Sequence, residues 1–174
     1  MCGHHRPRGT AICLVICVCV FGGCSRNTQD RSRTDLPDLA PIHEAVLRHD
    51  VRGVEKEIRQ GVSADVENRS GRITALQLAS GCGYTDVMEI LLENGADVNH
   101  RGVSGHTPLH CAAALGRYQA VEWLLQHGAD PSARITSGET PLDLARANLQ
   151  TVPFSAGVDW KRTCEIIQSS VTVR

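Results

Sequence analysis

The stretch TPLHCAAALG, residues 107–116, reads as a short helix with its own start and stop signals. Thr107 is a favourable N-cap, and Pro108 suits the first helical turn, where no backbone donor is needed. Gly116 can end the helix. Three small or apolar residues give this helix a narrow apolar face, so that its neighbours can approach closely: Leu109, Ala112 and Ala113.

A second helix is predicted after this one, because apolar residues recur there at i, i+3 and i+4. These residues are Val121, Leu124 and Leu125, and Gly128 stops the helix. The sequence ADPSARITSG, residues 129–138, then predicts an extended, turn-rich excursion. One such helix pair cannot bury its apolar stripe alone, whereas stacked pairs can.

The chain repeats this unit. TALQLASGCG begins at Thr74 and TPLDLARANL at Thr140, so that the three threonines are 33 residues apart. Gly95 and Gly128 keep the same spacing. A weaker copy, APIHEAVLRH, begins at Ala40. A fixed period of this length is typical of stacked repeat proteins.

The pattern T-P-L-H, A-A, G, V-x-x-L-L and G-A-D resembles the ankyrin repeat over Asp38 to Gln168. The resemblance implies an all-α solenoid of about four helix–turn–helix repeats with protruding hairpin loops. We expect the repeat domain to occupy residues 38–168, followed by a C-terminal tail at 169–174. The expected repeats are 38–71, 72–105, 106–138 and 139–168.

The same resemblance makes His110 a structural residue that ties its own turn to the next repeat. His43 occupies the matching position in the first copy. Gln77 and Asp143 stand there in the second and fourth copies, so whether that bond exists in these two repeats is left open.

The end repeats differ from the middle ones, as expected for repeats that cap a stack. Lys56 and Glu57 replace apolar residues of the second repeat, so the outer helix of the first repeat can face water. The last repeat has about ten extra residues between its helices, within the insertion at 145–159 that contains Phe154. This lengthened loop is either a neutral insertion or a partner contact.

The N-terminus has the three-part layout of a secretory signal. Arg6 and Arg8 precede an apolar run from Ala11 to Phe21, which is eleven residues without a charge. A membrane-spanning helix needs about 20 apolar residues, so a permanent span is the weaker interpretation. The sequence VFGGC, ending at Cys24, resembles the bacterial lipobox, although Phe21 departs from the usual leucine.

This resemblance implies that residues 1–23 are a signal peptide and that Cys24 is lipidated. Residues 24–37 are rich in charged and hydroxyl side chains and predict a flexible tether. We expect a protein of the cell envelope, held to the membrane by lipid on Cys24. Residue 25, directly after the lipidated cysteine, is serine and not aspartate, which in a Gram-negative host favours the outer membrane. The alternatives are a short uncleaved anchor and an ordinary secreted protein.

The rest of the chain lacks the spacing of known catalytic and metal-binding motifs. The histidines beyond residue 40 follow the repeat period, not a ligand set. Cys82, Cys111 and Cys164 are expected to be buried thiols, because helix packing keeps them too far apart for a disulfide. The formal net charge of −1 does not suggest a nucleic-acid partner. We therefore predict no enzyme activity, no cofactor and no metal.

The predicted function is to bind an unknown protein partner as a monomer, through the loop tips and the exposed side of the inner helices. An inhibitor or immunity-type role toward an envelope enzyme, or a scaffolding role, is the alternative. Position in the repeat selects ten candidate contact residues: Val103, Ser104, His106, Ala114, Leu115, Thr136, Ser137, Glu139, Arg146 and Ala147.

Overall fold

The computed structural model describes residues 40–68, 72–102, 104–151 and 159–172. These residues form four helix pairs and no strand. The pairs are α2 (Pro41–Leu47) with α3 (Val51–Arg59), α4 (Ala75–Cys82) with α5 (Thr85–Glu93), α6 (Pro108–Ala114) with α7 (Tyr118–Gln126), and α8 (Pro141–Thr151) with α9 (Trp160–Thr172). The predicted all-α solenoid of four helix–turn–helix units is confirmed.

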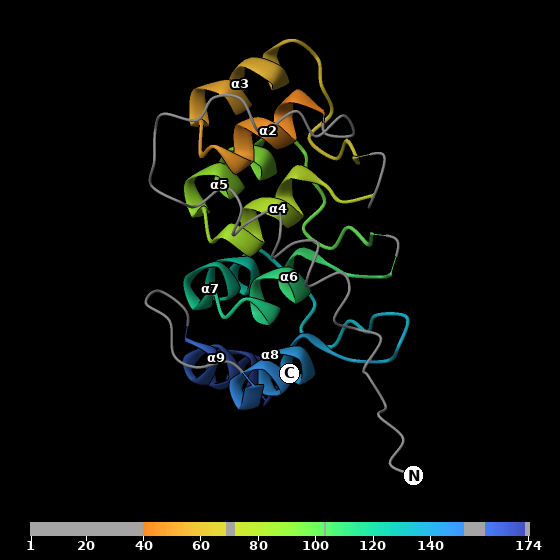
Figure 1. Cartoon of the computed structure of the whole chain (residues 1–174), viewed down its shortest axis with the longest axis vertical. Coiled ribbons are helices and arrows are strands. Elements are labelled where there is room, and N and C mark those ends of the chain that lie inside the picture. Colours follow the sequence, from red (N-terminus) through yellow and green to blue (C-terminus); the bar gives the residue numbers. More distant parts are fainter. Residues whose placement is uncertain (1–39, 69–71, 103, 152–158, 173–174) are drawn as a thin grey trace.

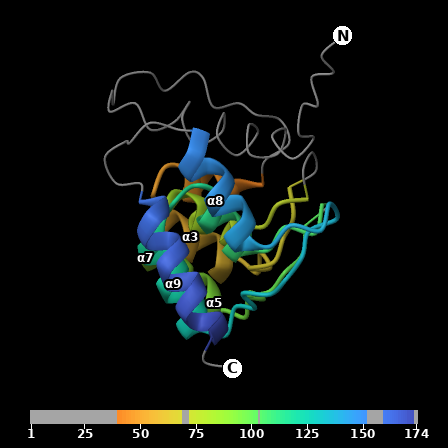
Figure 2. The ribbon, with the colours of Figure 1, turned by 90° about the horizontal axis from the view of Figure 1, so that it is seen from below.

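The pairs stack one upon another along the long axis of the molecule (Figure 1). Seen along this axis, the helices lie on one side and the loops that join successive pairs project on the other (Figure 2). We call the described parts of these projections the first, second and third finger loops, which are residues 62–68 with 72–73, residues 95–102 with 104–106, and residues 128–139. The even-numbered helices are called inner and the odd-numbered helices outer.

The inner helices start where capping side chains satisfy the first backbone donors. The hydroxyl of Thr74 accepts from the backbone N–H of Gln77, and the Gln77 side chain accepts from the N–H of Thr74 at 2.9 Å. Thr107 and His110 form the same reciprocal capping box in α6. At the other end of α4, Gly83 has a φ of 83°, a left-handed conformation that suits glycine.

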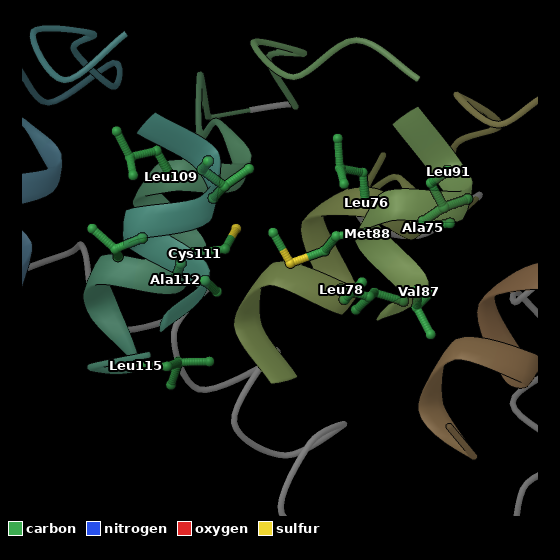
Figure 3. Packing of buried hydrophobic residues seen from close by; sticks show 14 of the residues in the cluster. Ala75, Leu76, Leu78, Val87, Met88, Leu91, Leu109, Cys111, Ala112 and Leu115 are labelled. Carbon is green, nitrogen blue, oxygen red and sulfur yellow. The ribbon is translucent and has the colours of Figure 1, made fainter. Parts of the chain in front are cut away.

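The core lies between successive pairs and consists of apolar side chains from both kinds of helix. Five large side chains in the two middle pairs are fully buried: Leu76, Met88, Leu91, Leu109 and Leu124. Figure 3 shows Met88 pointing from the second pair toward Cys111 of the third. Small residues such as Ala112 and Ala113 are also fully buried, which lets the inner helices pack closely.

The two end pairs present polar outer helices, as expected for caps. In α3 only Val54 is buried, while Lys56 is exposed. Helix α9 buries one stripe of residues and exposes the charged residues between them. The buried stripe consists of Trp160, Thr163, Cys164 and Ile167.

The predicted insertion begins as helix. Helix α8 has 11 residues, against 7 in α6, so the additional residues first lengthen the inner helix. The remainder, residues 152–158 with Phe154, lies outside the described residues, as do the signal segment, Cys24 and the tether. Among the described helices, none combines the length and the apolar character that a membrane crossing needs.

Truncating a core leucine should destabilise the stack far more than truncating an exposed one. Leu76 is fully buried, so Leu76→Ala should lower the free energy of unfolding by about 2–5 kcal/mol. The matched control is Leu149→Ala on another inner helix, where the leucine is 47% exposed and the change should stay within about 0.5 kcal/mol. Urea denaturation followed by circular dichroism measures both; equal losses would contradict this description of the core.

Candidate partner-binding surface

Hydrogen bonds between neighbouring finger loops fix their spacing. The backbone N–H of Asp97 donates to the carboxylate of Asp65 at 3.0 Å, joining the first two loops. In the next step the N–H of Asp130 donates to the side-chain oxygen of Asn99 at 2.9 Å. The side-chain nitrogen of Asn99 in turn donates to the carbonyl of Gly128 at 3.1 Å. Each finger loop is therefore held by the one before it.

The second and third finger loops are also joined near their tips. Both the backbone N–H and the hydroxyl of Thr136 donate to the carbonyl of Ser104, at 3.0 and 2.9 Å. Within each loop, a backbone bond closes the hairpin, from Gly102 to the carbonyl of His106 and from Ile135 to that of Glu139. The tips are thus presented as a preformed surface.

In the first two repeats, the side chain at the fourth position of the inner-helix turn connects that turn to the following repeat. In the first repeat the ring nitrogen Nε2 of His43 bonds the carbonyl of Ile73 at 2.8 Å. In the second, the side-chain nitrogen of Gln77 donates to the carbonyl of His106 at 2.6 Å. The sequence left open whether Gln77 makes this connection, and the structure shows that glutamine does so.

His110 bonds within its own turn, whereas the bond to the next repeat that the resemblance implied is not formed at hydrogen-bond distance among the described residues. Its Nδ1 atom accepts from the backbone N–H of Thr107 at 3.2 Å, and the ring is fully buried. Burial, together with a smaller effect of the neighbouring His106, lowers the pKa of His110 to about 4, although the backbone of Glu139 opposes the shift. The ring is therefore neutral at pH 7, which suits a structural role.

Asp143 makes its bonds within its own turn. One carboxylate oxygen accepts from the backbone N–H of Thr140 at 2.9 Å and from the Thr140 hydroxyl at 2.7 Å. These bonds hold the pKa of Asp143 below its usual range. Helix α8 opens the last helix pair of the described chain, so a residue that only caps its own helix is sufficient there.

The ten candidate contact residues fall into three groups. Four lie exposed on the third finger loop and on α8: Thr136, Ser137, Arg146 and Ala147. Three are partly exposed: Ser104, His106 and Glu139. Val103 lies outside the described residues. The remaining two, Ala114 and Leu115, lie at the end of α6 and are buried.

The expectation that Ala114 and Leu115 lie on an open face is wrong. They are only 5% and 8% exposed. The fourth repeat covers the end of α6, where the carbonyl of Ala114 accepts from the side chains of Asn148 at 2.8 Å and Trp160 at 3.1 Å. Because α6 ends in small residues, the following helix pair approaches closely enough to close this part of the surface.

The open surface that remains is called the finger face. It consists of Ser104, His106, Thr136, Ser137, Glu139, Arg146 and Ala147. Hydroxyl groups, one acid and one base dominate it, which suits hydrogen bonding to another protein. Leu149 was missed by the sequence prediction and is exposed on the extra turn of α8, beside this face in sequence. The only feature of the sequence that pointed to Leu149 was its place within the insertion.

Two observations on the described residues concern metal binding and thiol reactivity. These residues contain no group of three or more potential metal-binding side chains. Burial raises the pKa of the Cys164 thiol, which disfavours the reactive thiolate. Cys111 is buried as predicted, whereas Cys82 is only partly buried.

Removing the Gln77 side chain should weaken the connection between the second and third repeats. Gln77→Ala deletes the bond to the carbonyl of His106 and half of the capping box. That carbonyl keeps its bond from Gly102, so the free energy of unfolding should fall by about 1–2 kcal/mol. Gln126→Ala, at an exposed position of α7, is the control for urea denaturation. Equal unfolding midpoints for the two variants would exclude this role.

Comparisons with known proteins agree with the geometry. A family model for ankyrin repeats in three copies matches residues 42–135, over half of the chain. The protein phosphatase 1 regulatory subunit 12A of Mus musculus is 33% identical over 85 residues, covering 49% of this chain and 8% of that protein. The NF-kappa-B inhibitor cactus of Drosophila yakuba is 34% identical over 87 residues, covering 46% of this chain and 18% of that protein.

A putative ankyrin repeat protein of Rickettsia bellii is 51% identical over 45 residues, covering 26% of this chain and 19% of that protein. The chain thus spans less than a fifth of the length of each of these relatives. The similarity lies in the repeats that the family model describes. This chain belongs to the ankyrin repeat family.

Proposed function

We propose that this protein is a membrane-anchored lipoprotein whose ankyrin repeats bind a protein partner in the cell envelope through the finger face. Ankyrin repeats imply protein–protein interaction, and the described residues contain no group of three or more potential metal-binding side chains. The observation that carries the binding proposal is the bond from Thr136 to Ser104, which joins two finger tips into one surface.

A preformed surface lowers the cost of binding, because few backbone and side-chain conformations are lost when the partner arrives. The bonds from Asp65, Asn99 and Ser104 provide this order along the row of finger loops. The exposed hydroxyls and the opposite charges of Glu139 and Arg146 then supply directional contacts. The proposed partner therefore presents a largely polar surface with matching donors and acceptors.

Site-specific photo-crosslinking tests this surface. A crosslinking amino acid at Thr136 or Arg146 should give the same covalent adduct in living cells, because both residues are exposed on the finger face. The matched control places it at Gln119 or Glu122, which are exposed on outer helix α7. Denaturing gels and mass spectrometry identify the adducts.

The yield of the adduct should depend on a charge on the finger face and not on a charge on the outer helix α7. Arg146→Glu should reduce the yield of the adduct formed from Thr136 at least several-fold, whereas Glu122→Arg should leave it unchanged. An adduct that forms equally well from both faces, or that neither substitution affects, would refute the finger face as the binding site.

The anchoring proposal rests on the basic start, the eleven-residue apolar run and the Gly22–Gly23–Cys24 sequence. Two or three acyl chains hold a protein durably at a membrane, whereas one chain holds it only marginally. Lipid on Cys24 followed by a polar tether would keep the repeat stack near the membrane surface. This arrangement would let the finger face search a limited region of the envelope for its partner.

Replacing the proposed lipid attachment residue tests the anchor. Cys24→Ser should abolish incorporation of labelled palmitate and leave an uncleaved precursor or a soluble exported form. The circular dichroism spectrum of the repeats should not change, because Cys24 lies outside the repeat domain. Intact-mass analysis of the wild type should show a chain that begins at a lipidated Cys24; one that keeps Met1, or begins elsewhere without lipid, would exclude the anchor.

An inhibitory role is the second candidate, and the names of two relatives favour it. One is a regulatory subunit of a phosphatase and the other is an inhibitor. If the crosslinked partner is an enzyme, its activity with a saturating amount of this protein distinguishes the roles. Inhibition that Arg146→Glu relieves supports this candidate, whereas unchanged activity supports a scaffold.

A further inference from the structure

We propose that acid opens the repeat stack most readily at the junction between the third and fourth repeats, where His110 and His106 lie together. This inference rests on the contacts of the junction residues and does not depend on the proposed partner or anchor. Three junctions occupy equivalent positions in the chain, so each can be compared with the other two.

The junction between the third and fourth repeats contains two histidine rings. The centroids of His106 and His110 are 5.9 Å apart, with one ring presenting its edge to the other. Nδ1 of His106 and Nε2 of His110 are buried and have no hydrogen-bond partner among the described residues. Because Nδ1 of His110 accepts from the backbone N–H of Thr107, a second proton on this ring would displace that bond. The backbone of Glu139 and Ala133 favours the protonated ring, but burial outweighs it. A proton on Nδ1 of His106 would have no partner.

The charged groups around the two rings do not offset this cost. Glu139 of the third finger loop raises the pKa of His106, but burial lowers it more. Arg101 of the second finger loop lowers the pKa of His110, as does His106 itself. From the preceding repeat, the uncharged side chain of Gln77 reaches only the carbonyl of His106.

The central junction has no titrating residue at the equivalent position. Gln77 connects the second repeat to the third, and its amide does not change charge with pH. Arg117 adds a bond from its side-chain nitrogen to the carbonyl of Gly81 at 3.1 Å across the same repeats. Arginine stays protonated throughout the relevant pH range, so acid leaves both contacts in place.

The junction between the first and second repeats contains a single buried ring, His43, whose Nδ1 atom also has no hydrogen-bond partner among the described residues. Two other histidines there face carboxylates. His49 of the first repeat lies 2.9 Å from the carboxylate of Asp86. His100 lies 3.0 Å from the carboxylate of Glu67 on the preceding finger loop. Burial lowers the pKa of His43 as well, but this junction holds one such buried ring where the third junction holds two.

The direction of the pH effect follows from the neutral state of the buried rings. The unfolded chain takes up a proton near pH 6.5, whereas burial lowers the pKa of folded His110 to about 4. The stabilisation is thus complete above about pH 6.5 and is lost as the pH falls toward 4. This single ring should reduce the ratio of closed to open junction roughly a hundredfold by pH 4.

Residue-resolved hydrogen exchange of the full chain at pH 7.5 and pH 4 tests the proposal. Protection factors in α8 and at Thr136 should fall roughly a hundredfold. Those in α4 and α5 should change less than about fivefold. Loss of protection that is uniform along the stack, or largest in the first repeat, would overturn the proposal.

Gln77 indicates a conservative replacement for His110. His110→Gln places at the third junction the residue that already works at the second, so this variant should fold at pH 7.5 and keep the protection of α8 at pH 4. The reciprocal change Gln77→His should create an acid-sensitive central junction. If His110→Gln loses as much protection in α8 as the wild type does, the proposal fails.

A test that needs no variant is a pH titration of His110, in which nuclear magnetic resonance records the chemical shifts of the carbon-bound ring protons. A neutral ring down to about pH 4 is expected. A midpoint near pH 6.5 in the folded protein would overturn the proposal directly. Should His110→Gln fold poorly, His106→Ile replaces it, because Ile73 stands 33 residues earlier at the equivalent position.

Discussion

The junction between the second and third repeats depends on one side chain that bonds both to its own helix and to the next unit. Gln77 shows the full set of contacts: it caps α4 with one end of its amide and holds the carbonyl of His106 with the other. Because a helix pair cannot bury its apolar stripe alone, this contact also sets how neighbouring pairs meet. The position of the finger loops, and therefore of the finger face, follows from it.

The fold was largely readable from the sequence because its signals are local and recur. Caps such as Thr107, stop residues such as Gly128 and the 33-residue spacing each indicate the helix pair without reference to any neighbour. Exposure is a property of the assembled stack. Ala114 looked like a contact position, yet Asn148 and Trp160 of the next repeat cover it, and no local pattern states how close that repeat comes.

Histidine serves two different physical purposes in this stack. Buried His43 and His110 are useful as neutral rings that bond within the repeat framework, whereas His49 and His100 face carboxylates nearer the surface. Burial disfavours the protonated form of His43 and His110. Glutamine at position 77 achieves the first purpose without the dependence on pH.

The polar outer surface of the end pairs has a consequence for growth of the stack. A repeat solenoid is open at both ends, and identical units could in principle continue it head to tail into a filament. Lys161, Arg162 and Glu165 on α9 are exposed, as is Lys56 on α3. Joining two molecules through such surfaces would strip water from charged groups without burying an apolar stripe, so polymerisation along the axis is disfavoured.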